Sequence, residues 1–131
     1  MIKYISDTAS FRLIDPLTIE INYFDNEEID KTDIIEHMLI TEQLSCQRKL
    51  NYLLIFNENI NISQDAINFL TNEWDKRSGK VLSRAIICRS KIPNNWLDYF
   101  NRSSQSIKTK LFSNVTEARM WLKTINKKVI I

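Results

Sequence analysis

Few side chains in this sequence have the chemistry of a catalytic group, and those few stand far apart. The chain has one histidine, His37, and two cysteines, Cys46 and Cys88. Acid–base catalysis by His37 would need an orienting carboxylate and a nucleophile, and the spacing around it implies neither. We therefore interpret His37 as a histidine at the margin of an apolar helix face. So few histidines and cysteines exclude the usual zinc clusters, and we predict no metal site.

We interpret the two cysteines as buried free thiols. Cys88 ends an apolar segment, which favours an inert core thiol, because a nucleophilic cysteine needs a lowered pKa. Cys46 has two basic neighbours, Arg48 and Lys49, but no general base beside it. Two distant thiols in separate apolar contexts are typical of a reducing compartment, so we expect a cytoplasmic protein.

The scarcity of glycine excludes a further group of functions. Gly79 is the only glycine in the sequence, whereas P-loops and dinucleotide-binding loops both need several glycines at fixed spacing. No set of residues with the spacing of a catalytic site is left. We predict a non-enzymatic protein that uses no cofactor.

Polar side chains after the predicted buried strands form the candidate contact surface. In open α/β sheets, ligands and partners meet the loops at the carboxyl ends of the parallel strands. The side chains that we assign to this partner-binding rim are Asn57, Asn59, Asn61, Ser63 and Arg89. Ser63 with a nearby Arg89 would form a modest anion site at a helix N-terminus. The alternative is that Ser63 is a helix N-cap and Arg89 a solvated charge at a strand end.

Hydrophobic periodicity predicts the elements that would position these side chains. Alternating polar and apolar residues, and short apolar runs, predict five strands. They span residues 11–15, 17–23, 50–56, 81–88 and 107–112. Helical spacing of apolar residues predicts four helices. They span residues 30–44, residue 63 to near Gly79, a short segment opened by Pro93, and residues 114–125.

The element order is ββαβαβαβα, which predicts the α/β fold class. Strands that alternate with helices imply a single domain with a mixed, mostly parallel sheet flanked by helices. The first two strands are expected to form an antiparallel pair around Pro16. We assign residues 10–126 to this domain, residues 1–9 to an N-terminal lead-in and residues 127–131 to a C-terminal tail.

The end of the chain resembles a known family. Residues 110–122, KLFSNVTEARMWL, combine a strand that ends in Phe with a capped helix that carries Glu-Ala and Trp-Leu. This segment is similar to the C-terminal signature of the SpoIIAA-like and STAS-like domains. Residues 84–88, RAIIC, are similar to that family's apolar strand two elements earlier. The resemblance covers residues 10–125 and implies a STAS/SpoIIAA-like fold.

The resemblance also implies a function. The STAS group includes anti-sigma-factor antagonists, which act as protein-binding switches and not as enzymes. Their switch is a serine, usually preceded by Asp, at the start of the helix after the central strand. Ser63 occupies this place here, and Ile62 stands where the pattern has Asp. Phosphorylation there would add about −1.5 to −2 charges. The resemblance thus implies a regulatory protein-binding module with Ser63 as the phosphorylation candidate.

A carrier or sensor of an apolar or anionic small molecule is the alternative function. An α/β fold with large aromatic residues could open a pocket between its helices and its sheet. Broader relatives of the SpoIIAA-like domains resemble lipid-binding Sec14-type folds, which implies the same kind of function.

Charge is divided unequally along the chain. Residues 1–66 hold 5 Lys/Arg and 12 Asp/Glu, a net charge of −7, and residues 67–131 hold 13 and 4, a net charge of +9. Such a split is compatible with three arrangements: binding of an anionic partner, oppositely charged elements that face each other within one fold, or contact between two copies of the chain in a homodimer. Nucleic acid is not the expected partner, because the basic residues are dispersed and lack a groove-reading motif.

The three tryptophans are predicted to be core residues, because Trp74, Trp96 and Trp121 fall on inward helix stripes.

The sequence predicts no membrane association. Its longest apolar runs, such as residues 53–56, are far shorter than the roughly 20 residues that span a bilayer. The N-terminus lacks the apolar core of a signal peptide. The expected partner is therefore another soluble protein.

Overall fold

The computed structural model describes residues 3–74, 80–89, 92–104 and 107–130 of the chain. Its strands are β1 (Lys3–Ile5), β2 (Ala9–Asp15), β3 (Thr18–Tyr23), β4 (Glu28–Ile29), β5 (Leu50–Phe56), β6 (Asn61–Ile62), β7 (Val81–Cys88) and β8 (Lys108–Phe112). Its helices are α1 (Lys31–Ser45), α2 (Gln64–Phe69), α3 (Asn94–Ser103) and α4 (Val115–Ile130), and a π-helical turn (Leu70–Trp74) follows α2.

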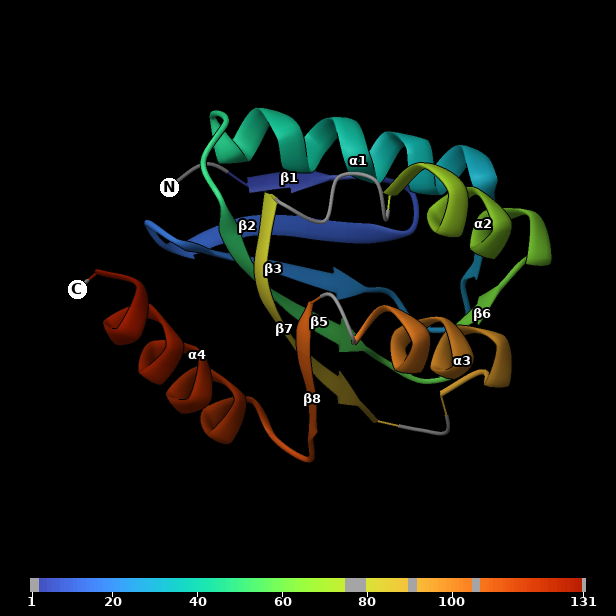
Figure 1. The fold of residues 1–131 in the computed structure, drawn as a ribbon. Helices are drawn as coiled ribbons and strands as arrows, with labels where there is room; N and C mark the ends of the chain where they lie inside the picture. Colours follow the sequence, from blue (N-terminus) through green and yellow to red (C-terminus); the bar gives the residue numbers. More distant parts are fainter. Residues whose placement is uncertain (1–2, 75–79, 90–91, 105–106, 131) are drawn as a thin grey trace.

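Six strands form one sheet in the order β1-β2-β3-β5-β7-β8. The β1–β2 and β2–β3 pairs are antiparallel, and β3, β5, β7 and β8 run parallel to one another. Each parallel strand is added on the same side of its predecessor, so right-handed crossovers place the three connecting helices on one face. Figure 1 shows α1, α2 and α3 together, with α4 separate from them. The predicted α/β class with a mostly parallel sheet flanked by helices is confirmed.

The N-terminal segment differs from the expected lead-in. Residues 3–5 form an edge strand that pairs with β2, in the register Lys3↔Arg12 and Ile5↔Ser10. The turn that follows is fastened by Ser6, whose hydroxyl donates to Ala9 O at 3.2 Å. The element order therefore begins with three strands instead of two, and the assignment of residues 1–9 to a lead-in is wrong for the described part of that segment.

Two short elements were not predicted. β4 and β6 form a separate two-stranded parallel sheet, in which Ile29 pairs with Ile62. Each has only two residues, too few for a periodic signal. The predicted helix from residue 63 begins as α2 and continues as the π-helical turn. Its expected end near Gly79 lies outside the described residues.

Local capping explains where the helices begin. Asp30 caps α1 in a reciprocal capping box with Asp33, and both bonds measure 2.9 Å. Ser63 caps α2 through the backbone N–H of Ala66, as predicted. Asn114 accepts from the backbone N–H of Glu117 at 2.9 Å before α4. Helix α4 then extends to Ile130, so the expected tail from residue 127 is largely helical.

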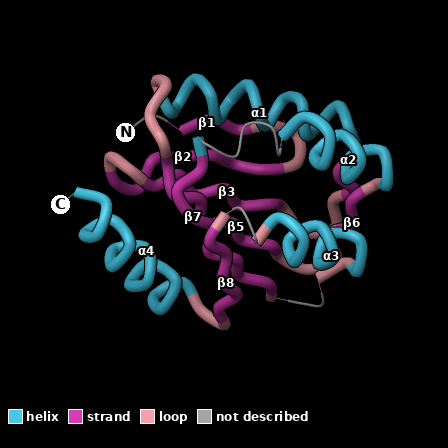
Figure 2. Tube along the Cα trace, viewed as in Figure 1, coloured by secondary structure: helices cyan, strands magenta, loops and turns pink. Residues whose placement is uncertain are grey.

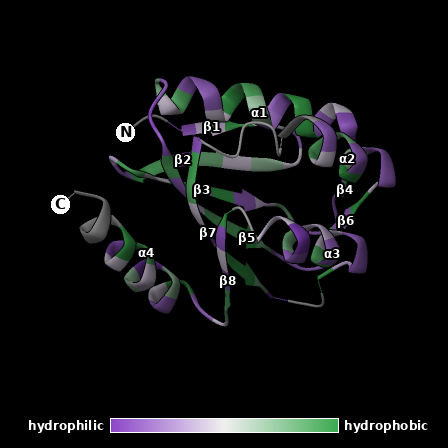
Figure 3. Cartoon of the chain, viewed as in Figure 1, coloured by the Kyte–Doolittle hydropathy of each residue, from purple (hydrophilic) through white to green (hydrophobic). Residues whose placement is uncertain are grey.

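The sheet is buried on both of its faces, but by unequal layers. Against α1, α2 and α3 lies a large aromatic and aliphatic core that includes Phe11, Phe56 and Trp96. Against α4 lies a smaller aliphatic core, in which Leu53 and Ala85 meet Leu122. Figure 2 shows the strands between these helices, and Figure 3 shows hydrophobic residues concentrated on the central strands. Successive residues of a strand point to opposite faces, so each central strand serves both cores.

A buried carboxylate ties α4 to the sheet. Glu20 of β3, only 6% exposed, accepts from Arg12 of β2 and from Arg119 of α4, each at 3.1 Å. Both arginines are partly exposed, which weakens each ion pair by solvent screening. The carboxylate itself is buried, so its two guanidinium partners compensate for its desolvation.

We predict that Glu20→Gln lowers the free energy of unfolding by about 1 to 2 kcal/mol, because the two guanidinium donors lose the negative charge of their shared acceptor. Urea denaturation at pH 7 measures the change. Glu28→Gln is the matched control, because Glu28 is exposed on β4, and it should change stability by no more than about 0.5 kcal/mol. Equal effects of the two substitutions would contradict an anchoring role for Glu20.

Candidate functional site

A cavity of about 50 Å³ lies between the sheet and the helices α1 and α3. It is lined by Ile21, Tyr23, Ile34, His37, Thr41, Tyr52, Leu54, Leu70, Arg84, Trp96, Tyr99 and Phe100. Every one of these residues is buried. One water needs roughly 10–15 Å³ of such volume, so the cavity has room for a few non-hydrogen atoms.

Strand alternation and helix periodicity bring these side chains together. Tyr23, Tyr52 and Arg84 come from β3, β5 and β7 and lie on the sheet face that α1 and α3 cover. His37 follows Ile34 by three residues on α1, one helical turn further along the same face. The cavity therefore results from the α/β layering itself.

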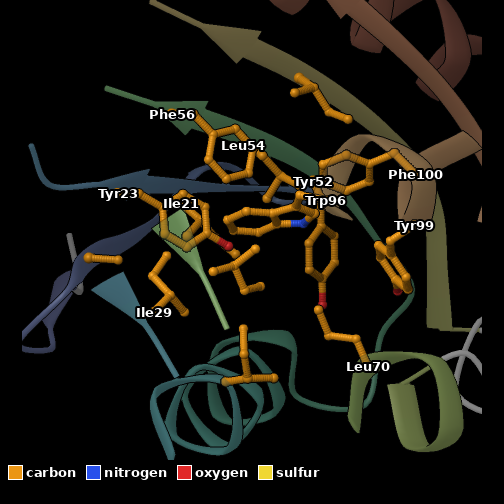
Figure 4. Close-up of a cluster of buried hydrophobic side chains, with 14 of the residues drawn as sticks. Ile21, Tyr23, Ile29, Tyr52, Leu54, Phe56, Leu70, Trp96, Tyr99 and Phe100 are labelled. Carbon is orange, nitrogen blue, oxygen red and sulfur yellow. The ribbon is translucent and has the colours of Figure 1, made fainter. Parts of the chain in front are cut away.

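Five of the twelve residues that line the cavity are aromatic: Tyr23, Tyr52, Trp96, Tyr99 and Phe100. The Tyr23 and Phe56 rings stack with centroids 4.7 Å apart, and the Trp96 ring meets Phe56 edge-on at 4.2 Å. Trp96 also stacks on Phe100 at 5.8 Å. Figure 4 shows the rings of Tyr23, Trp96, Tyr52 and Tyr99 gathered between the sheet and the helices. Rings packed at these distances make a rigid wall.

His37 is the cavity residue with an unused hydrogen-bonding group. Its Nε2 lies 2.8 Å from Thr8 Oγ1, and its ring packs edge-on against Phe11 at 5.0 Å. Its Nδ1 is buried and has no hydrogen-bond partner. Burial lowers the pKa of His37 from 6.5 to about 4, so the ring is neutral at pH 7. One polar atom of His37 is thus buried without a partner.

Arg84 brings a positive charge to the same cavity. It is 3% exposed and lies on β7. Its Nη2 donates to Ser103 Oγ at 2.6 Å and to Thr109 Oγ1 at 3.0 Å. The guanidinium carbon lies 5.2 Å from the Phe100 ring centre and 5.8 Å from that of Tyr99. These contacts hold the guanidinium plane in one orientation, because Arg stacks favourably on aromatic faces.

Two tyrosines add neutral hydroxyls. Burial is the main cause that raises the pKa of Tyr23 far above its usual range, with a smaller contribution from Tyr52. Burial also raises the pKa of Tyr52 to about 12, although a hydrogen bond with Thr41 opposes the shift. Both phenols are therefore protonated at neutral pH. The cavity offers an imidazole nitrogen, a guanidinium and aromatic faces, a set suited to holding a small, flat, acidic group.

The predicted rim residues have mostly structural roles. Asn57 Nδ2 donates to Asn22 Oδ1 at 2.5 Å and to Tyr23 O at 2.6 Å, which ties β5 to the end of β3. Asn59 donates to Asn26 Oδ1 at 3.0 Å, and both have positive φ, a conformation that Asn tolerates. The structure thus fastens the loops around residues 24–28 and 57–60 to each other.

The other rim residues lie in three different settings. Asn61 is exposed on β6, where its backbone N–H donates to Glu27 O at 3.0 Å. Ser63 Oγ accepts from Ala66 N–H at 3.2 Å, so its hydroxyl caps α2 as the structural alternative expects. The Arg89 side chain is exposed after β7, and its backbone N–H donates to Phe56 O at 2.9 Å.

The remaining sequence-predicted side chains lie away from the cavity. Cys46 is exposed in a left-handed conformation after α1, so the expectation of a buried thiol is wrong there, and Cys88 is half-buried at the end of β7. Trp96 is buried as predicted, Trp121 is half-buried against Phe112, and the Trp74 side chain lies outside the described residues. Within the described part of the chain, no group of three His, Cys, Asp or Glu side chains could hold a metal ion.

Sequence reasoning missed two of the polar cavity residues. His37 was placed at the margin of its helix face, yet it lies one turn after Ile34 and one turn before Thr41, both buried. The one-turn spacing from Ile34 was the sequence signal that could have placed His37 on the buried face of the helix. Arg84 stands two residues before Ile86 in a strand buried on both faces, so its side chain had to point inward. A charged residue inside an apolar strand is the signal to look for.

Comparisons with known family models, with curated proteins and with solved structures found no match for this chain. The STAS/SpoIIAA-like resemblance consequently remains a prediction. Among the described helices, none is both long and apolar enough to cross a membrane.

We predict that His37 makes the protein less stable in mild acid. The pKa of His37 is about 4 when folded and 6.5 when exposed, so the unfolded chain binds more protons between these values. Stability is therefore complete above pH 6.5 and falls as the pH drops toward 4. Between pH 7 and pH 5 this loss is about 2 kcal/mol. Urea denaturation at both pH values measures it.

His37→Asn is the control, because it removes the titrating group while both proteins keep the same carboxylates. Between pH 7 and pH 5, the free energy of unfolding of this variant should fall by about 2 kcal/mol less than that of the wild type. Identical pH dependence of the two proteins would show that His37 is not buried in its neutral form.

Proposed function

We propose that this chain is a non-enzymatic module that binds a small acidic molecule in the cavity beneath α1 and α3, as a sensor or carrier. The observation that carries the proposal is the unpartnered Nδ1 of buried His37, in a cavity that Arg84 also lines. A buried polar group without a partner costs about 1–3 kcal/mol. A ligand that bonds to Nδ1 recovers this energy, whereas an apolar filler would not.

The dimensions and the charge select the ligand. A volume of about 50 Å³ admits a group of a few atoms, such as a carboxylate with a short substituent. The Arg84 guanidinium supplies positive charge, and because its Nε and Nη2 already donate to Thr109 Oγ1, a carboxylate in the cavity would be attracted by that charge. The mostly aliphatic and aromatic lining supports binding in place of catalysis, and neither Cys46 nor Cys88 lines the cavity.

Formate, acetate and propionate are the first probes, and ethylamine is the charge-reversed control. We expect an acid of this series to raise the melting temperature and to move the NMR signal of the Trp96 indole. Leu70→Phe should fill the cavity and weaken binding at least about tenfold, because Leu70 lines it.

Leu111→Phe is the matched control, since Leu111 is 50% exposed on β8, remote from the cavity lining. It should leave the affinity unchanged. Binding of all probes by the Leu70→Phe variant with wild-type affinity would contradict the cavity as the site, and so would equal binding of ethylamine.

We propose protein binding at the rim as a second function, in line with the family resemblance. The observation that favours it is the fixed geometry of this surface. The hydrogen bonds from Asn57 and Asn59 hold two loops together, and Asn59, Asn61 and Arg89 are exposed on or beside them. A surface that is ordered before binding loses less conformational entropy on association.

Arg89→Glu and Asn61→Arg test the rim, because both alter exposed side chains and should preserve folding. We expect each variant to lose a near-stoichiometric partner that the wild type captures from host cytosol, as read by mass spectrometry. Lys123→Glu, an equivalent charge reversal on α4, should retain the partner. Retention by all three variants would exclude this surface as the contact.

A further inference from the structure

The face of the sheet covered by α4 contains a second cleft, separate from the cavity described above. Its volume is about 300 Å³, and it is lined by Ile14, Asp15, Thr18, Arg119, Leu122 and Lys123. These residues come from the β2–β3 hairpin and from α4. None of them lines the cavity beneath α1 and α3.

Two polar groups of this cleft are buried without a hydrogen-bond partner: Thr18 Oγ1 and Arg119 Nε. Thr18 is 1% exposed. Burial of two such groups is unfavourable unless something between them supplies bonds. An oxygen atom that accepts from both the Arg119 Nε–H and the Thr18 hydroxyl would satisfy both groups.

The unpartnered hydroxyl lies at the end of a polar row that crosses the sheet. Thr18 of β3 is in register with Asn51 of β5, and Asn51 with Ser83 of β7. All three are fully or almost fully buried. Further along the row, Ser83 Oγ donates to Asn51 Oδ1 at 2.7 Å, so that end is satisfied internally. At the other end Thr18 lines the cleft, where its hydroxyl can bond to a bound group.

The charges of the cleft indicate the sign of that group. Arg119 and Lys123 are positive, and Glu20 accepts from Arg119 Nη2 at 3.1 Å, which leaves Nε unused. Asp15 is the acidic member of the lining, and its Oδ1 already accepts from Leu17 N–H at 2.8 Å. The apolar side chains of Ile14 and Leu122 complete the wall.

We propose that this cleft binds a small organic molecule that carries an oxyanion, either a carboxylate or a phosphate. The oxyanion bonds to Arg119 Nε–H and the Thr18 hydroxyl and pairs with the Lys123 ammonium, while an apolar chain packs on Ile14 and Leu122. The proposal is independent of the ligand assigned to the His37 cavity, because the two sites lie on opposite faces of the sheet.

Titration of the full chain followed by amide NMR tests the proposal, in a buffer free of other oxyanions. The probes are inorganic phosphate, acetate and hexanoate, with hexylamine as the charge-reversed control. We expect saturable shifts at Thr18, Arg119, Leu122 and Lys123. Hexanoate should bind more tightly than acetate, because its chain reaches the apolar wall. Whichever of phosphate and acetate binds more tightly shows whether the cleft prefers a phosphate or a carboxylate.

Three variants separate the proposed contacts. Thr18→Val removes the hydroxyl with little change of shape, and Arg119→Lys keeps the charge but removes Nε. Each should weaken hexanoate binding about five- to tenfold. Lys123→Gln leaves the Glu20 cluster intact and should weaken binding at low salt more than at high salt. Lys110→Gln on exposed β8 is the control and should bind as the wild type does.

Thermal melts of each variant confirm that it is folded before its affinity is compared. Unchanged affinity in both Thr18→Val and Arg119→Lys would overturn the proposal, as would equal shifts with hexylamine. Saturation with no shift at the four cleft residues would assign the binding elsewhere. Absence of any shift with all three oxyanions would also overturn the proposal. Shifts confined to Trp96 and Tyr99 would support the other cavity and exclude this one.

Discussion

The burial of β5 on both of its faces is the constraint on which the rest of the structure depends. All seven of its residues are buried, and a strand in this position needs helices above and below it. Its even-numbered side chains, such as Tyr52 and Leu54, pack toward α1 and α3. Its odd-numbered ones, such as Leu53 and Ile55, pack toward α4. One strand thereby builds two interiors of different chemistry.

The two interiors also differ in the polar groups that they contain. Beneath α1 and α3, aromatic rings enclose His37 and Arg84, and the guanidinium lies against Tyr99 and Phe100. Beneath α4, aliphatic packing adjoins the polar row that ends at Thr18. Buried polar groups persist where they are bonded or where a bound group completes their bonding. The unused nitrogen of His37 and the unused hydroxyl of Thr18 are the observations behind the two proposed sites, one on each face.

The sequence allowed the long elements to be predicted, because each buries a periodic face. β5 was predicted at residues 50–56 and β7 at 81–88, and both are found there. β1 was missed because three residues carry no usable period, and its pairing with β2 is a tertiary contact. The rim residues were placed correctly after the strands, but their bonding could not be predicted. Asn57 and Asn59 bond to the loop around residues 22–26, and such long-range pairing leaves no local pattern.

The first turn of α3 joins the cavity to the rim. Asn95 Nδ2 donates to Ile62 O at 3.0 Å, and its Oδ1 accepts from the N–H of Trp96 at 2.9 Å. Trp96 lines the cavity, and Ile62 immediately precedes Ser63 at the cap of α2. A ligand that displaces Trp96 must therefore strain or move the bond from Asn95 to the rim. Two sites are coupled when the ligands of both bias the equilibrium of the same element. This bond supplies a physical reason why ligand binding and partner binding would be coupled in one small domain.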